Sequence, residues 1–322
     1  MGVLINVLRG SAFALLAGAW IASAQQYPGK PIHFIIPAAP GGALDLTART
    51  LGQKLSESLG QPVVMDNRGG AAGNIGTALG AKAAPDGYTL VVTYSGTMAI
   101  APWLYKERRY HPLRDFAHVI QASSYPLLGV VHPSVPVKNL KELAAFARTH
   151  PKGLTFGSAA ATTQLTAELF QIITGTRMTH VPYKGAGLVA IDLIGGHISL
   201  AFPAPTSVVG YVKDGRLRAL VTTGASRLAA LPDVPTSKEA GYPGLEVENW
   251  YGVSAPANTP KEIVARLNAE FVQALKLPDV RDRMVSAGLD PVGGSSERFT
   301  AFIKADYERW GEVVKKVGMT PQ

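Results

Sequence analysis

Glycine and hydroxyl side chains gather in several loops of this sequence, in a pattern that suits the binding of a small anion. The first loop contains Pro40, Gly41, Gly42 and Ala43, followed by Asp45. Glycine lets a backbone approach a ligand closely, and the unpaired N–H groups at a helix start favour negative charge. A carboxylate in a first helical turn interacts with the helix dipole. We therefore expect Asp45 to shape the loop, with ligand contact as the lesser alternative.

Three further segments offer similar chemistry. Ser95, Gly96 and Thr97 follow an expected strand and add hydroxyl donors. Later candidates are Ser158, Thr162, Thr163 and Gln164 in one loop, Tyr183, Lys184 and Gly185 in the next, and Ala204 after the expected strand 198–202. Simple turn chemistry is the alternative for each loop taken alone. Together they predict an anion held by amide and hydroxyl groups, with Lys184 able to add a charge.

The sequence contains little evidence of catalytic or cofactor-binding motifs that would favour another function. The segment 185–190 fits G-x-G-x-x-A, the looser dinucleotide pattern, but an exported protein rarely meets NAD. The chain has no G-x-S-x-G, S-x-x-K or H-E-x-x-H motif. Its seven histidines show no metal-ligand spacing, and His33 lies in an apolar strand. We expect no enzyme, cofactor or metal site; a hydrolase using Ser95 or Ser158 stays an alternative, because triads assemble from distant positions.

The elements that position these loops alternate between strand and helix. Apolar strands are expected at 31–36, 62–65 and 88–94, and a helical stripe from Leu44 ends at Gly60. The alternation resumes over 127–222, and the tail from 261 is mostly helical. This order predicts an α/β protein of two lobes, each a mainly parallel sheet flanked by helices, with a cleft between them. We assign 25–124 with 248–322 to lobe 1 and the inserted segment 125–247 to lobe 2.

The length, the net charge and the N-terminal sequence limit the classes to which this protein can belong. The chain has 322 residues, 47% hydrophobic and 17% charged, with a net charge of +8 and no cysteine. Arg9, an apolar run and Ala22-Ser23-Ala24 predict a secretory signal over 1–24, with a buried N-terminal helix as the alternative. Basic residues are scattered without a nucleic-acid motif, which argues against nucleic acid. The charge suits a small anionic ligand or a generally positive surface.

At these loops the sequence resembles the Bug family, the substrate-binding proteins of tripartite tricarboxylate transporters. The segments that carry the resemblance run in order along the expected mature chain: Tyr27-Pro-x-Lys30-Pro31, Pro40-Gly-Gly-x-x-Asp45-x-x-Ala-Arg49, Asn67-Arg68-x-Gly-Ala-x-Gly-Asn-Ile-Gly76, Pro85-Asp86-Gly87-Tyr88-Thr89-Leu90, Val181-Pro-Tyr-Lys-Gly185, Asp192-Leu-x-Gly-Gly196, Leu231-Pro-Asp-Val-Pro-Thr236, Glu239-Ala-Gly-Tyr-Pro243, Trp250-Tyr-Gly and Ala255-Pro-x-x-Thr-Pro260.

The resemblance implies a periplasmic, type II-like binding protein that hands a small carboxylate to the permease subunits of a tripartite carrier. It implies a monomer whose loops at Gly41 to Ala43 and at Gly185 grip the carboxylate through backbone amides. A sensor that presents the bound ligand is the alternative. The family often has Ser-x-Gly-x-Gly-Ser where this chain has Ser158-Ala-Ala-Ala-Thr162-Thr163, and it often has histidine at Gln164. These departures, and the apolar Leu188 after the Tyr-Lys-Gly motif, bear on which acid is bound.

Overall fold

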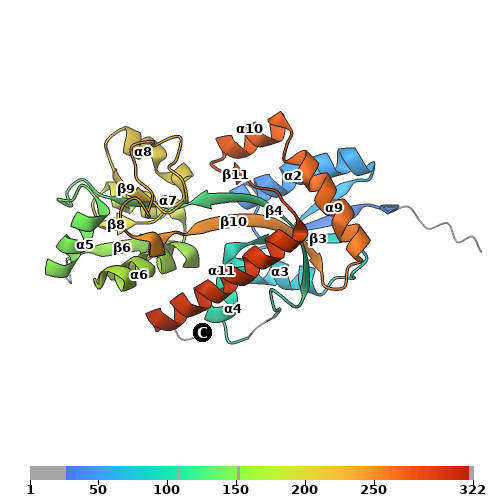
Figure 1. Ribbon diagram of the computed structural model, residues 1–322, viewed down its shortest axis with the longest axis horizontal. Helices are drawn as coiled ribbons and strands as arrows, with labels where there is room; N and C mark the ends of the chain where they lie inside the picture. The colour runs from blue at the N-terminus through green and yellow to red at the C-terminus, as the bar shows by residue number, and fades with distance from the viewer. Residues whose placement is uncertain (1–26, 108, 151–152, 319–322) are drawn as a thin grey trace, which may run out of the picture.

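The computed structural model describes residues 27–107, 109–150 and 153–318. The signal sequence expected over 1–24 lies outside these residues. Two sheets with flanking helices form two lobes, which lie side by side along the long axis of the molecule (Figure 1). This confirms the expected two-lobed α/β fold. No helix within the described ranges has the length and apolar character needed to cross a membrane.

Lobe 1 is built on a six-stranded sheet with the order β11-β4-β10-β3-β1-β2. Its strands are β1 (Ile32–Ile36), β2 (Val63–Asn67), β3 (Thr89–Tyr94), β4 (Phe116–Pro126), β10 (Glu248–Pro256) and β11 (Asp290–Pro291). Its helices are α2 (Ala43–Leu59), η1 (Ala71–Gly73), α3 (Asn74–Ala81), η2 (Gly96–Ile100), α4 (Ala101–Leu104), α9 (Lys261–Ala274), α10 (Pro278–Ser286) and α11 (Ser296–Val317).

Both faces of this sheet are covered, which explains why the central strands β1 and β3 are mostly apolar and buried. Side chains alternate along β1, so Phe34 and Ile36 pack in a cluster with α2 and α9. Ile35 points the other way, into a cluster with α3 and α11 that includes Phe299. Helix α2 follows the predicted apolar stripe and ends where Gly60 adopts a left-handed conformation, as expected.

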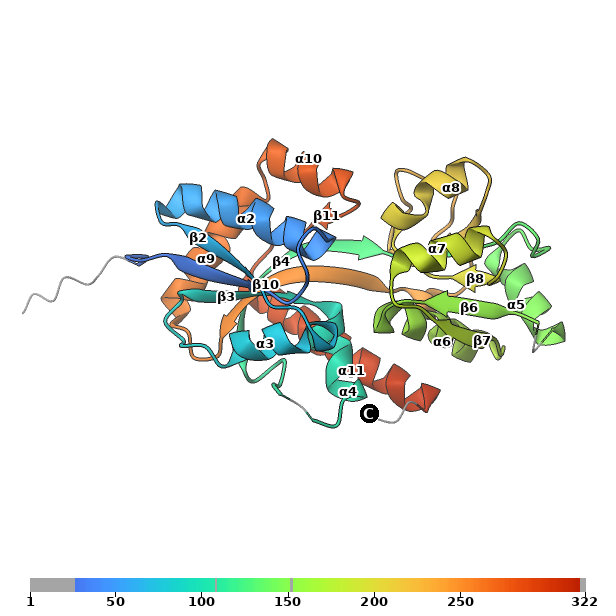
Figure 2. The ribbon, with the colours of Figure 1, turned by 180° about the vertical axis from the view of Figure 1, so that it is seen from behind.

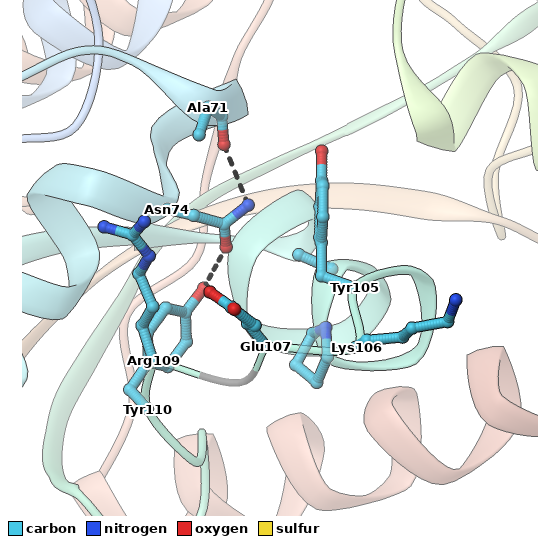
Figure 3. Close-up of a pocket in the computed structure, with 9 residues that line it drawn as sticks. Ala71, Asn74, Tyr105, Lys106, Glu107, Arg109 and Tyr110 are labelled. Carbon is cyan, nitrogen blue, oxygen red and sulfur yellow. Dashed lines mark hydrogen bonds between the residues drawn. The ribbon is translucent and has the colours of Figure 1, made fainter. Parts of the chain in front are cut away.

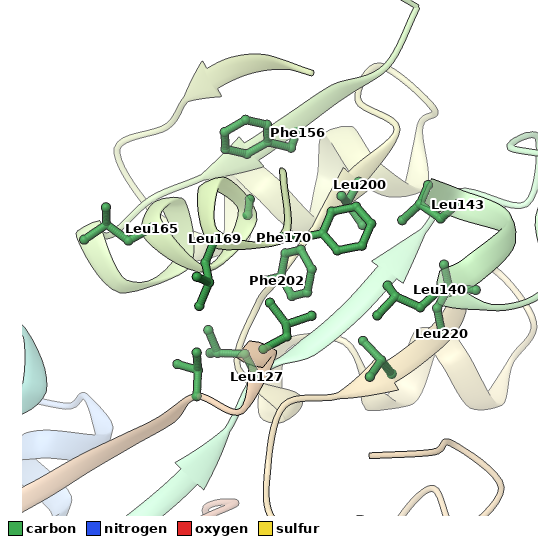
Figure 4. Close-up of a cluster of buried hydrophobic side chains, with 14 of the residues drawn as sticks. Leu127, Leu140, Leu143, Phe156, Leu165, Leu169, Phe170, Leu200, Phe202 and Leu220 are labelled. Carbon is green, nitrogen blue, oxygen red and sulfur yellow. The ribbon is translucent and has the colours of Figure 1, made fainter. Parts of the chain in front are cut away.

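Lobe 2 is built on a five-stranded sheet with the order β7-β6-β8-β5-β9. Its strands are β5 (Leu128–Val131), β6 (Thr155–Ser158), β7 (Thr179–Pro182), β8 (Leu200–Ala201) and β9 (Arg218–Thr222). Its helices are α5 (Leu140–Thr149), α6 (Ala161–Thr174), α7 (Ala186–Ile194), η3 (Pro205–Ser207), α8 (Val209–Lys213) and η4 (Pro243–Leu245). Phe156, Phe170 and Phe202 lie at the centre of its main core (Figure 4).

The expectation of mainly parallel sheets is wrong in this detail. Among the strands of the described ranges, the pairs β1–β2, β1–β3, β6–β7 and β6–β8 are parallel, and the other ladders are antiparallel. In lobe 1 the reason is the pair β4 and β10, long antiparallel strands that run between the lobes (Figures 1 and 2). In lobe 2 it is β5, which pairs antiparallel with both β8 and β9. The predicted loops nevertheless follow β1, β3, β6 and β7, which take part in the parallel ladders.

The lobes are connected by helix α11 as well as by the chain crossings at two strands. The chain changes sheet between β4 and β5 and again between β9 and β10, while the exact lobe boundaries remain a prediction. Helix α11 starts against the lobe 1 sheet, but Trp310, Val313 and Val314 in its second half pack into the main core of lobe 2. The end of the chain assigned to lobe 1 therefore contributes to both cores.

Candidate ligand-binding site

Three helices begin at one crevice with an N-cap residue that has no side-chain acceptor. The N-cap residues are Gly42 for α2, Ala160 for α6 and Gly185 for α7, and none provides a side-chain hydrogen bond to its helix. Because glycine and alanine have no side-chain acceptor, the first N–H groups of these helices keep their hydrogen-bonding capacity for another partner. The helix dipoles make the same positions favourable for negative charge.

The crevice consists of two adjoining cavities of about 390 and 220 Å³. The larger is lined by Gly42 and Ala43 from lobe 1 and by Ala161 from lobe 2, so it lies between the lobes. The smaller lies against lobe 2 and is lined by Ala186, in the first turn of α7. The cavities share Tyr125, Ala159, Ala160, Thr162 and Asn249, which makes them one continuous space.

The structure brings part of the predicted site together around this space. The predicted residues that line it are Gly42, Ala43, Ser95, Gly96, Ser158, Thr162, Thr163 and Ala204. They come from both lobes and from loops that follow β1, β3, β6 and β8. Their role in binding a ligand remains a prediction.

Asp45 does not line the crevice, and its contacts explain why. Its carboxylate accepts hydrogen bonds from the Gly41 N–H at 3.0 Å, from Arg49 Nε at 2.8 Å and from Asn67 Nδ2 at 2.9 Å. Burial alone would raise the pKa of Asp45, but these bonds to Arg49, Gly41 and Asn67 lower it to about 2. The Asp45 side chain is therefore ionised, and its hydrogen bonds hold the β1–α2 loop in place.

The other predicted residues also lie off the cavity walls. Pro40 and Lys184 are exposed, and Gly41 and Gly185 adjoin residues that do line the crevice. Thr97 is buried and donates to the Tyr94 carbonyl. The Tyr183 hydroxyl donates to Asp192 at 2.6 Å, and Gln164, half-buried on α6, is absent from both walls.

Asn249 is the most informative residue that the sequence did not reveal. It lies on β10 opposite Tyr125 of β4, is 2% exposed, and lines both cavities. Its Oδ1 accepts a hydrogen bond from Ser95 Oγ at 3.1 Å, while its Nδ2 has no partner among the described residues. An unpaired buried donor is destabilising unless something accepts from it. Asn249 therefore carries a buried side-chain donor without a partner among the described residues, at the wall of the crevice.

Ser158 and His180 form the pair that most resembles a catalytic arrangement. Ser158 Oγ lies 2.8 Å from His180 Nε2, and the imidazole stacks on Phe156. Burial lowers the pKa of His180, so the ring is neutral near pH 7. No carboxylate hydrogen-bonds this histidine in the described ranges, so the pair lacks the third group that orients a catalytic base.

A separate cavity of about 480 Å³ lies elsewhere. It lies on lobe 1 alone and is lined by Lys106, Glu107 and Arg109, with a wall fixed by the bond between the Tyr110 hydroxyl and Asn74 at 2.8 Å (Figure 3). Apart from the shared Ala101 and Tyr105, it has no wall in common with the crevice and contains no predicted site residue. Nor do the described residues include a cluster of histidine, aspartate or glutamate able to hold a metal ion.

Two α/β lobes joined by antiparallel strands around an interlobe crevice define a two-lobed binding protein. Residues 47–319 match the family described as "Tripartite tricarboxylate transporter family receptor". The chain belongs to this family, which confirms the resemblance to the Bug proteins. It is similar to Protein BugT of Bordetella pertussis (strain Tohama I), with 36% identity over 299 residues and 92% of each chain covered.

Solved structures show the same relationship. "R. palustris Rpa4515 with adipate" has a TM-score of 0.79 and 35% identity, covering 92% of this chain and 100% of that one. MatC from Rhodopseudomonas palustris with bound malate has a TM-score of 0.75 and 31% identity, covering 89% and 100%. The chain is therefore a solute-binding receptor by family.

Proposed function

We propose that this protein is a periplasmic, monomeric solute-binding protein that captures a small carboxylate between its lobes and delivers it to the permease subunits of a tripartite carrier. It catalyses no reaction. One observation carries the proposal: three uncapped helix starts, from both lobes, open on one crevice. The similar proteins with adipate and with malate support a carboxylate as the ligand.

Capture follows from the position of these helix starts. A carboxylate at the start of α2 accepts N–H bonds from lobe 1, and the start of α6 lines the same cavity from lobe 2. A ligand that bonds both lobes stabilises the closed arrangement over an open one, so binding shifts the population toward closure. Residues Gly42, Ala43, Ser95, Ser158 and Thr162 are the proposed contacts, with Asn249 added from the structure.

The test is a ligand screen on the mature chain, which we take to start after Ala24. Di-, tri- and aromatic carboxylates are compared with sugars and amines by thermal shift, and hits are measured by calorimetry. We expect at least one carboxylate to raise the melting temperature and to reduce the radius of gyration in small-angle scattering. Stabilisation by a neutral sugar or an amine, with no carboxylate active, would contradict the proposal. Transport is tested by loss of uptake of that acid in a deletion strain.

A further inference from the structure

In the described part of the chain, the walls of the crevice carry no charged side chain. Lysine, arginine, histidine, aspartate and glutamate are all missing from the described residues that line the two cavities. Rings and alkyl groups dominate instead, with Tyr94, Tyr105, Tyr125 and Tyr251 around the larger cavity and Leu127 and Phe202 in the smaller. A bound molecule is therefore surrounded mainly by carbon, and each of its charges has to be balanced by backbone and neutral side-chain donors.

Three of these tyrosines, Tyr94, Tyr125 and Tyr251, act mostly as rings, because their hydroxyl groups are engaged with one another or with the backbone. Tyr94 Oη donates to the Ala72 carbonyl at 2.6 Å. Tyr251 Oη donates to Tyr125 Oη at 3.3 Å, and these two rings lie with their centroids 5.3 Å apart. Burial raises the pKa of Tyr94, Tyr125 and Tyr251, so all three are neutral.

The side of the larger cavity that belongs to lobe 2 is formed mainly by small apolar groups. Ala159, Ala160 and Ala161 line it together with Thr162. The three methyl groups offer no hydrogen-bond donor or acceptor to a hydroxylated acid. Small side chains on one side and rings on the other leave space for a flat apolar group, which gains stacking energy from the rings.

Side-chain partners for a second ionised group are scarce. A carboxylate is satisfied by backbone N–H groups at the uncapped helix starts. Beyond them, Asn249 Nδ2 is the one buried side-chain donor in the described walls that lacks a partner. Additional carboxylates or hydroxyls would lose hydration against rings without full replacement of their hydrogen bonds. The walls thus discriminate by how many polar groups the ligand carries.

We infer, building on the proposed carboxylate binding, that the preferred ligand is an aromatic monocarboxylate and not a hydroxylated di- or tricarboxylate. The ring lies against the tyrosine side of the crevice, and the single carboxylate meets the helix starts. The physical cause is the uncharged, ring-lined wall, which favours one negative charge on a flat apolar body.

Calorimetry of the mature protein with five acids tests this inference: benzoate, cyclohexanecarboxylate, adipate, malate and citrate. We expect benzoate to bind at least about 10-fold more tightly than malate or citrate, and more tightly than its saturated analogue. Tighter binding of adipate, malate or citrate overturns the inference but leaves carboxylate binding intact. Equal affinity for benzoate and cyclohexanecarboxylate removes the aromatic preference. Binding of none of the five, with a non-carboxylate ligand found by the screen, overturns the proposed function itself.

A matched pair of variants at Tyr105 isolates the contribution of a ring. This side chain is 38% exposed and lines the larger cavity, so replacing it disturbs little of the core. Tyr105→Leu is expected to weaken benzoate binding about 2- to 10-fold and to leave cyclohexanecarboxylate unchanged. Tyr105→Phe keeps the ring and is expected to bind like the wild type. An equal loss for both acids in Tyr105→Leu would show that the position supplies only bulk.

Discussion

The substitution Gly42→Val is predicted to abolish ligand binding while leaving the fold intact. Gly42 is the N-cap of α2, with φ −83° and ψ 172°, a conformation that valine adopts without strain. A Cβ built at this position meets no heavy atom within 4 Å. The added isopropyl group therefore points into open space at the crevice wall, where it covers the first N–H groups of α2.

The magnitude follows from the hydrogen bonds that are lost. Each N–H bond to a charged group contributes about 1.5–3 kcal/mol, so blocking two of them raises Kd by at least about 100-fold. Valine is a poorer N-cap than glycine, which costs about 1 kcal/mol and lowers the melting temperature by a few degrees. The affinity effect is thus much larger than the stability effect.

The assay is calorimetry with the acid that most stabilises the wild type, alongside thermal unfolding of each variant. Gly210→Val is the matched control, since Gly210 is exposed on α8, has open space around its Cβ, and lines neither cavity. We expect the control to bind normally. Wild-type affinity in Gly42→Val would refute the placement of the ligand at the start of α2.

Three further predictions concern buried polar groups. Asn249→Asp keeps the size of the side chain and the bond from Ser95, but it replaces the free donor with a carboxylate oxygen. We expect carboxylate binding measured by calorimetry to be at least about 100-fold weaker, because the two negative charges repel. Unchanged affinity would show that Nδ2 does not face the ligand. Burial lowers the pKa of His118 to about 4, so between about pH 6.5 and 4 the unfolded chain takes up a proton that the folded protein does not, and stability falls as the pH falls. Urea unfolding should show the advantage of wild type over His118→Gln shrinking by about 3 kcal/mol from pH 7 to pH 4, and a constant difference would contradict this. Hydrogen bonds lower the pKa of Asp45 to about 2, which contributes about 2 kcal/mol to the free energy of unfolding above pH 4 and is lost as the pH falls through 2. Asp45→Asn should lack this contribution when stability is measured against pH, and it should bind ligand more weakly. The same loss of stability in acid for the variant and the wild type would show that the carboxylate does not stabilise the loop.

The local elements of this protein follow from the sequence because short-range chemistry fixes them. The apolar stripe from Leu44 predicts α2, and Gly60 ends it because a left-handed residue is needed there. Asn139 begins α5 by accepting a hydrogen bond from the Glu142 N–H, a contact between residues three positions apart. The loops after β1, β3 and β6 contain residues that line the crevice. Their glycine and hydroxyl residues made them recognisable in the sequence.

The long strands β4 and β10 and the residues they carry could not be found in this way. Both strands are buried along most of their length, so their sequences lack the alternation that identifies a half-exposed strand. Tyr125, Asn249 and Tyr251 reach the crevice only because these two segments, more than a hundred residues apart, pair between the lobes.

The sequence by itself predicted the glycine-rich and hydroxyl-rich loops that lead into helices, because such loops are recognised from neighbouring residues. It also determined the family, through motifs spread along the chain. Only the tertiary structure decided which of those helix starts share a cavity and that the side chains of Asp45 and Tyr183 are hydrogen-bonded elsewhere. It also decided that Nδ2 of Asn249 has no partner among the described residues. These outcomes depend on contacts between distant segments, which no local pattern encodes.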